Sequence, residues 1–307
     1  MKVLITGGAG FIGSHVVDRC VDAGHQVAVV DDLSTGNRQQ VNSAARLHVV
    51  DIRSAALDDV FRAETPDAVV HLAAQASVAR SVANPSLDAQ INVLGSINLF
   101  EGCRRAGARR IVYVSTGGAG YGDTDVIPTP EDHPSRPVSP YGTSKVAAEL
   151  YLACWEALHE VRGVVLRLAN IYGPRQDPQG EAGVIAIFTD RLLRGEPCII
   201  NGDGLQTRDY VYVGDVAEAA RLALERIEVT GPVNIGTGVE TSVVTLFERV
   251  RAAAGSAGKA QHAPARPGEQ RRSLLDASRA RRLLDWVPRV ALDEGLRRTI
   301  AARRAAG

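Results

Sequence analysis

Short runs of hydrophobic residues alternate with longer amphipathic stretches along the first half of the chain. The runs KVLIT, QVAVVD, RLHVVD, AVVHLAA and RIVYVST are rich in Val, Ile and Leu, and helical patterns separate them. Strands that are nearly continuous apolar runs are buried on both faces, which is typical of a parallel sheet covered by helices. The pattern therefore predicts an α/β fold with a Rossmann-type, doubly wound parallel sheet.

The second half of the chain follows this rhythm less strictly. The longest helices expected in the first half cover residues 84–106 and about 140–160, and beyond residue 168 the alternation loosens. We therefore expect a smaller, interleaved C-terminal substrate domain. Residues 1–168 would form the nucleotide-binding domain with 208–236 returning to it, and 169–207 with 237–307 would form the second domain.

Composition narrows the kinds of partner that the chain can have. Its 307 residues include 35 basic and 35 acidic side chains, so the overall charge expected of a nucleic-acid or membrane-surface binder is missing. No apolar run approaches the roughly 18 residues of a membrane span. The four cysteines form no Cys-x-x-Cys pair or Cys/His cluster, which predicts no metal site and reduced, mostly buried thiols. We expect a cytoplasmic protein that binds neither nucleic acid nor membrane.

Tyr141 and Lys145 form a Tyr-x-x-x-Lys step within a predicted helix, so both side chains share one face. A nearby ammonium stabilises phenolate and lowers the pKa of a phenol from its reference of about 10. Lys145 is also one of three lysines in a chain that otherwise uses arginine. We expect Tyr141 to act as a proton acceptor supported by Lys145. The alternative is an exposed helical tyrosine beside a chance lysine.

Gly7, Gly10 and Gly13 form a G-x-x-G-x-x-G pattern directly between a predicted strand and a predicted helix. Small residues let the backbone approach a pyrophosphate, and a helix that begins near Phe11 directs its free N–H groups at it. Asp31 ends the next strand, where a carboxylate accepts hydrogen bonds from ribose hydroxyls and repels a 2′-phosphate. The predicted cofactor is therefore NAD.

Two further acids leave alternatives open. Asp32 is a candidate cofactor contact, or it simply begins a turn. Asp51 ends the run RLHVVD and could contact the adenine amino group, or it could cap the following helix. Ile52, the next residue, is assigned to the same cleft.

Seven segments occur in one order: TGGAGFIG, the strand that ends at Asp31, HLAAQASV, YVSTGGAGYG, YGTSK, NIYGPRQDPQGEAG and RDYVYVGDVA. In this order the chain resembles the extended short-chain dehydrogenase/reductases and, more narrowly, the bacterial UDP-glucose 4-epimerases. The resemblance implies an isomerase that binds NAD and a nucleotide-sugar, with UDP-hexose as the first expectation. It also implies a homodimer in which the two long helices of each copy form a four-helix bundle.

The resemblance further implies roles for individual residues. Phe11 and Ile12 would meet the pyrophosphate, Asn92 would support the active site, and Thr116 would hydrogen-bond the sugar 4-oxygen. Leu168 and Asn201 stand where family members often carry aromatic residues. The implied cofactor-cleft residues are Leu72, Ala73, Ala74 and Gln75, and the implied substrate contacts are Ser77, Asn170, Gly183, Val184, Ile199, Asn201, Arg208, Arg266, Glu269 and Ser273.

Some of these substrate contacts have plainer interpretations. Guanidinium groups bind phosphate oxygens bidentately, which suits a diphosphate. Arg208 could instead be a charge at a strand edge, and Arg266 a charge in an arginine-rich loop. In the resemblance Ser273 faces the sugar 2-substituent, where a small residue leaves room for an N-acetyl group. Otherwise Ser273 only begins the run SLLD.

The mechanism implied is epimerisation by transient oxidation at C4, with Tyr141 as the base. A 4,6-dehydratase or decarboxylase of the same fold is the main alternative, but such enzymes carry an acid where this chain has Gly117 and Gly118. A non-catalytic NAD-sensing protein could lose the Tyr/Lys pair that this chain keeps. A dehydrogenase that releases NADH stays open.

Overall fold

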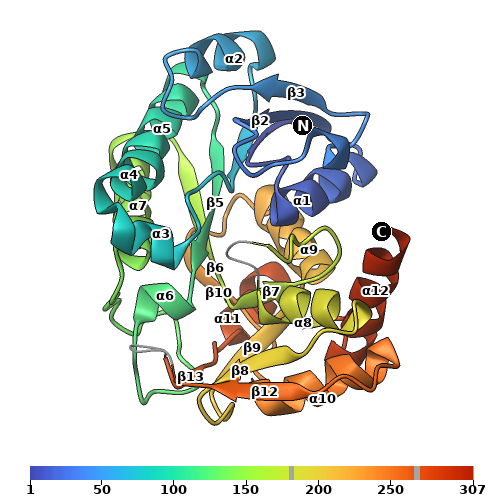
Figure 1. Ribbon diagram of the computed structural model, residues 1–307. Helices are drawn as coiled ribbons and strands as arrows, with labels where there is room; N and C mark the ends of the chain where they lie inside the picture. The colour runs from blue at the N-terminus through green and yellow to red at the C-terminus, as the bar shows by residue number, and fades with distance from the viewer. Residues whose placement is uncertain (180–182, 266–269, 307) are drawn as a thin grey trace.

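The computed structural model describes residues 1–179, 183–265 and 270–306. Its centre is a seven-stranded sheet in the order β10-β6-β5-β4-β1-β2-β3, in which every neighbouring pair is parallel (Figure 1). The Rossmann-type sheet predicted from the sequence is therefore confirmed. Its strands are β1 (Lys2–Thr6), β2 (Gln26–Asp31), β3 (Arg46–Val49), β4 (Ala68–His71), β5 (Arg110–Thr116), β6 (Arg162–Leu168) and β10 (Gly231–Ile235).

Helices cover both faces of this sheet (Figure 1). α1 (Phe11–Asp22), α9 (Val213–Glu225) and α11 (Ser278–Leu284) share one buried cluster with the strands. α2 (Leu57–Glu64), α5 (Gly95–Ala106) and α7 (Pro140–Leu158) share the cluster on the opposite face. Because alternate strand residues enter each cluster, the strands need apolar side chains at nearly every position.

The helix expected over residues 84–106 is present with one irregularity. α4 (Pro85–Ala89) begins with the Asn84 side chain as its cap and Pro85 in its first turn. A π-helical turn, η2 (Gln90–Leu94), connects it to α5. π turns often mark functional sites, and this one holds Asn92, which is 1% exposed. The other short elements are η1 (Arg38–Gln40), α3 (Val78–Ala83) and α6 (Gly118–Tyr121).

The remaining elements pack around a separate hydrophobic cluster. Strand β9 joins a small sheet with β7, β11 and β13 instead of the large sheet. Within residues 208–236, β10 adds a strand to the large sheet and α9 packs on one face of that sheet, whereas β9 belongs to the small sheet. The domain boundaries therefore stay a prediction. These elements are β7 (Asn170–Tyr172), α8 (Val184–Leu193), β8 (Cys198–Asn201), β9 (Thr207–Tyr212), β11 (Glu240–Ser242), α10 (Val243–Ala254), β12 (Ala260–Ala263), β13 (Arg272–Ser273) and α12 (Leu292–Ala305).

The structure bears on two sequence expectations, those on membrane spans and on cysteines. Within the described ranges, no helix combines the length and the apolar character that crossing a bilayer requires. Cys20, Cys103 and Cys198 are free and buried, as expected. Cys154 differs, because it lies exposed on α7.

Candidate active site

The turn between β1 and α1 brings backbone segments closer together than side chains would allow. Gly7 has a φ of 70°, and a Cβ on it would stand 2.7 Å from the Ala73 nitrogen. A Cβ on Gly13 would lie 2.0 Å from the Gly7 carbonyl oxygen. α1 begins at Phe11 after Gly10, and no side chain caps it. Its first N–H groups therefore suit an anion such as a pyrophosphate.

Asp31 and Asp32 follow one another at the end of β2 but have different surroundings. Asp31 is 7% exposed, and its two carboxylate oxygens accept hydrogen bonds from the backbone nitrogens of Ala9 and Leu33, each at 2.9 Å. Burial raises the pKa of Asp31, and these hydrogen bonds oppose that rise. Asp32 accepts from the backbone and hydroxyl of Ser34, so it begins a turn. Each carboxylate keeps lone pairs for a further donor.

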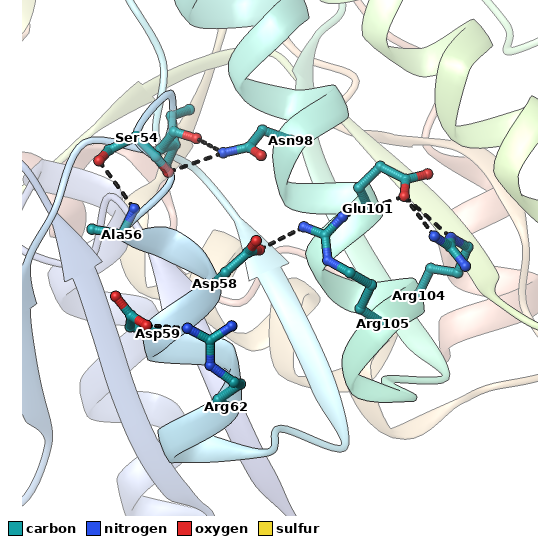
Figure 2. Close-up of polar contacts among 10 residues, drawn as sticks. Ser54, Ala56, Asp58, Asp59, Arg62, Asn98, Glu101, Arg104 and Arg105 are labelled. Carbon is teal, nitrogen blue, oxygen red and sulfur yellow. Dashed lines mark hydrogen bonds and ion pairs between the residues drawn. The ribbon is translucent and has the colours of Figure 1, made fainter.

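The turn after β3 is held against α5. Asn98 of α5 donates to the carbonyl oxygen of Ile52 at 2.7 Å and to that of Ser54 at 3.3 Å. Figure 2 shows the Asn98 side chain pointing toward Ser54. Asp51 caps the backbone nitrogen of Arg53 at 2.8 Å and pairs with its guanidinium, which lowers the pKa of Asp51. Asp51 therefore stabilises this turn, but it does not cap the following helix, because α2 begins at Leu57 after Ala56 and has no side-chain cap.

These segments border one cleft at the carboxyl ends of β1, β2 and β4, where nucleotides bind to such sheets. Thr35, Val50 and Ile91 also line it, and sequence reasoning missed them although each lies within a few residues of a predicted position. Glycine backbone, apolar walls and strand-end carboxylates fit a dinucleotide. The predicted residues that line the cleft are Gly7, Gly10, Asp31, Asp32, Asp51, Ile52, Leu72, Ala73 and Ala74.

Gln75 and Asn92 lie behind the cleft and bind each other. The Gln75 nitrogen donates to Asn92 Oδ1 at 2.8 Å, and Asn92 Nδ2 donates to the Gln75 carbonyl oxygen at 2.9 Å. Asp88 Oδ1 accepts from Gln75 Nε2 at 2.8 Å and from Asn92 Nδ2 at 3.1 Å. Asn92 also reaches the Ser144 hydroxyl on α7 at 3.1 Å. The π turn is thus tied to the helix that carries Tyr141, which supports the positioning role expected for Asn92.

Tyr141 lies in the first turn of α7, one turn before Lys145. Its pKa is raised to about 12, first by burial and then by the charge of Asp88. The expectation from residue spacing was the opposite, a phenol pKa lowered by Lys145. Spacing along a helix shows that two side chains share a face, but it does not show how deeply the phenol is buried. The protein alone therefore keeps Tyr141 protonated near neutral pH.

Lys145 is 3% exposed. Burial lowers its pKa to about 7, although the charges of Glu149 and Asp88 act in the opposite direction. Its Nζ lies 4.2 Å from the centroid of the Tyr113 ring. The plain alternative, an exposed helical tyrosine beside a chance lysine, does not fit, because Lys145 is buried and Tyr141 is partly buried.

Thr116 ends β5 and lies opposite Leu168 of β6. Its Oγ1 accepts from the Ala119 nitrogen at 3.3 Å and leaves its own proton available to a ligand. Ser273 comes close to this turn, since a Cβ on Gly118 would stand 3.2 Å from Ser273 Oγ. Leu168 is 5% exposed within the core, which accounts for an aliphatic residue there.

The predicted substrate contacts lie mainly on the smaller sheets. Arg208 and Ser273 face each other across the β9 and β13 pair. Asn170 begins β7, Ile199 and Asn201 lie on β8, and Ser77 caps α3. Gly183 caps α8 and Val184 begins it, with no side-chain cap. Arg266 and Glu269 lie outside the described residues.

Residues 3–236 match the NAD dependent epimerase/dehydratase family. The chain belongs to this family. The matched range contains the glycine turn, Asp31, Asp32, Thr116, Tyr141 and Lys145. These parts of the candidate active site therefore lie within the region that the family model covers. Residues beyond 236, which include β13 and Ser273, lie outside the matched range.

Other members of the family extend the likeness over the whole chain. UDP-glucose 4-epimerase of Mycolicibacterium smegmatis is 44% identical over 98% of this chain and 97% of its own length. A crystal structure of UDP-glucose 4-epimerase with UDP-glucose from Thermotoga maritima is 45% identical, with a TM-score of 0.96 over 100% of this chain and 99% of that one. The UDP-glucose 4-epimerase of Thermus thermophilus, in a crystal structure of its complex with NAD, is also 45% identical, with a TM-score of 0.95 over 100% of both chains.

Proposed function

We propose that this chain is an NAD-dependent nucleotide-sugar 4-epimerase that interconverts UDP-glucose and UDP-galactose. The observation that favours it over a dehydratase or decarboxylase is the turn after Thr116. Gly117 and Gly118 supply no side chain to this turn, and a Cβ on Gly117 would stand 2.6 Å from Leu275 Cδ1 and displace it, so the turn lacks the extra acid that elimination needs. The full-length likeness to epimerases supports the same choice.

The cleft residues described above would hold NAD, with Asp31 as acceptor for the adenosine ribose and the glycine turn against the pyrophosphate. When bound, NAD takes up and returns the hydride of C4, and its positive ring favours the phenolate of Tyr141. Tyr141 would remove the proton from the sugar 4-hydroxyl, and Lys145 would support the resulting charge. Thr116 can both donate and accept, which suits an oxygen that alternates between hydroxyl and carbonyl.

For the nucleotide-sugar, we propose that Arg208 and Arg266 bind the diphosphate and that Glu269 contacts the ribose. Ile199 and Asn201 would lie against the base, while Asn170, Gly183 and Val184 would contact the substrate near α8. Ser273 is supported as a contact beside the sugar by its closeness to Gly118. Because serine is small, we expect the N-acetylated pair of UDP-sugars to be accepted as well.

The test is to incubate the protein separately with UDP-glucose, UDP-N-acetylglucosamine and UDP-glucuronate, and to resolve the products by anion exchange and NMR. We expect 4-epimers without net NADH. The Tyr141→Phe variant should bind NAD normally and lose more than about tenfold in rate, a barrier increase above about 1.4 kcal/mol. Net NADH would indicate a dehydrogenase, and a variant with more than a tenth of the rate would remove Tyr141 as the base.

We also propose a homodimer that pairs through the helices η2, α5 and α7. Leu150 and Leu158 of α7 are 68% and 67% exposed, and Leu94 of η2 is 59% exposed. Leu150, Cys154 and Leu158 follow one another at four-residue steps and share a helix face. Light scattering should therefore give twice the chain mass, and alkylation of Cys154 should slow as concentration rises. A monomer across the micromolar range would contradict this proposal.

We propose a cytoplasmic location as well. All four cysteines are free in the structure, and three of them are buried. Free buried thiols are common where the compartment is reducing. Fractionation of the source cells with an antibody against the chain would test this, and recovery outside the cytoplasm would contradict it.

A further inference from the structure

The ammonium of Lys145 is buried without a charged partner of its own. It forms no hydrogen bond or ion pair with any residue in the described ranges. Glu149, one turn further along α7, is engaged by Arg167 at 2.6 Å and by the hydroxyl of Ser115. Asp88 is engaged by Gln75 and Asn92 as described above. A charge removed from water needs compensation, and these carboxylates supply it only from a distance.

The group that does lie against this ammonium is an aromatic ring. Tyr113 of β5 is completely buried, and Lys145 Nζ lies 4.2 Å from its ring centroid. Cations within about 6 Å of a ring face are attracted by its quadrupole, most strongly where water is excluded. Neighbouring rings hold Tyr113 in place, with His71 at 5.5 Å and Phe100 at 6.3 Å between centroids.

We infer that Tyr113 is a positioning residue whose ring holds Lys145 in place and in its charged form beneath Tyr141. This inference rests on the proposed function, because it assigns to the ring the support of the charge that Lys145 lends to catalysis. The ring is the relevant part of Tyr113, because Lys145 Nζ lies over it, whereas the hydroxyl is buried near the Ser96 side chain and meets no described residue in good hydrogen-bonding geometry.

The groups that face Lys145 explain why a modest attraction between the Tyr113 ring and the Lys145 ammonium matters. Glu149 and Asp88 favour the charged form, and His71 is neutral at working pH because burial lowers its pKa to about 3. Tyr141 is neutral until it loses its proton, and burial raises the pKa of Tyr113 well above the working range. Since burial lowers the pKa of Lys145 to about 7, removing the ring should move it further down, into the range where the ammonium is lost at neutral pH.

A direct test measures the titration of Lys145 without any turnover. Lysine labelled with carbon-13 at Cε gives three signals in this chain, from Lys2, Lys145 and Lys259, and the Lys145→Met variant assigns the one in question. We expect Tyr113→Leu to lower the Lys145 midpoint by about half a unit to one unit. Tyr113→Phe keeps the ring and should leave the midpoint in place. Phe61→Leu removes a ring from the same buried cluster that is not among the rings packed on Tyr113, and it serves as the packing control.

The second measurement is the rate of UDP-glucose epimerisation against pH. The limb that follows Lys145 should move to lower pH in Tyr113→Leu and stay in place in Tyr113→Phe and Phe61→Leu. Should Tyr113→Leu not fold, Tyr113→Met removes the same ring. An unchanged midpoint in the ring-less variant, or an equal shift in Phe61→Leu, overturns the inference. Absence of epimerase activity in the wild type would defeat the proposed function instead, and the lysine titration would still decide the role of the ring.

Discussion

The two sides of the candidate site are built in different ways. The cofactor side is largely backbone: the turn from Gly7 to Gly13, the first turn of α1 and strand ends that share one parallel sheet. The substrate side is built from side chains such as Arg208 and Ser273 on short strands of the smaller sheets. Those strands come from segments more than sixty residues apart in the chain.

This difference determines how each side should respond to substitution. A backbone site leaves no room for even a methyl group, so small changes should abolish binding altogether. A side-chain site can exchange one group for another, so its substitutions should change selectivity more than they change binding as a whole. Tyr141 and Lys145 lie on α7, between the two sides. They belong neither to the backbone-built cofactor side nor to the short strands of the substrate side.

Gly13→Ala should have the largest effect, and it acts on the cofactor side alone. Its Cβ would stand 2.0 Å from the Gly7 carbonyl oxygen, so the turn has to open. We expect NAD affinity to fall by more than about a hundredfold, measured by titration of the refolded apo-protein. Gly24→Ala, which strains the backbone away from the cleft at a φ of 82°, is the control and should keep its NAD affinity. Equal losses in both would mean that stability, and not the turn, was affected.

Ser273→Tyr acts on the substrate side and should change selectivity. The serine hydroxyl lies beside Gly118, next to the turn that follows Thr116, so a phenol ring there would fill the space proposed for the sugar 2-substituent. We expect the rate on UDP-N-acetylglucosamine to fall at least about tenfold, with UDP-glucose and NAD binding spared. Parallel loss of both activities, or a wild type inactive on the N-acetylated sugars, would show that Ser273 is not the gate.

The same contrast explains what could be predicted from the sequence. The sheet, the helix starts near Phe11 and Pro140, and the cleft-lining glycines and acids follow from local patterns, because each is fixed within a few residues. The membership of β9 in the small sheet does not, because strand partners are chosen by tertiary packing. The sequence also does not show which side chains are buried. The direction of the Tyr141 pKa shift and the position of the Tyr113 ring beneath Lys145 both depend on burial.

Asp31→Ala should have a moderate effect on the cofactor side, because it removes a side chain and not a backbone contact. The carboxylate binds the Ala9 and Leu33 nitrogens, so its loss also loosens the glycine turn. We expect NAD affinity to fall roughly three- to tenfold and the gap between NAD and NADP to narrow. Titration with both cofactors measures this, and equal affinities in the wild type would rule out Asp31 as the selecting residue.

Asp88→Asn should have the smallest effect and concerns the helices between the two sides. Asp88 is 1% exposed; its Oδ1 binds Gln75 and Asn92, while Oδ2 has no partner among the described residues. Its charge raises the pKa of Tyr141 and that of Lys145. Asparagine keeps an oxygen for the two hydrogen bonds but removes the charge, so both pKa values should fall.

Epimerisation needs Tyr141 without its proton and Lys145 with its proton, so the two limbs of the rate against pH follow these two groups. Removal of the negative charge should therefore move both limbs to lower pH, by about half a unit. The Tyr113→Leu variant differs, since it should move the Lys145 limb alone. Asp59→Asn removes an equal charge from an exposed position on α2 and should leave both limbs in place. If Asp88→Asn lowers the rate at every pH and moves neither limb, then Asp88 acts only through its hydrogen bonds to Gln75 and Asn92.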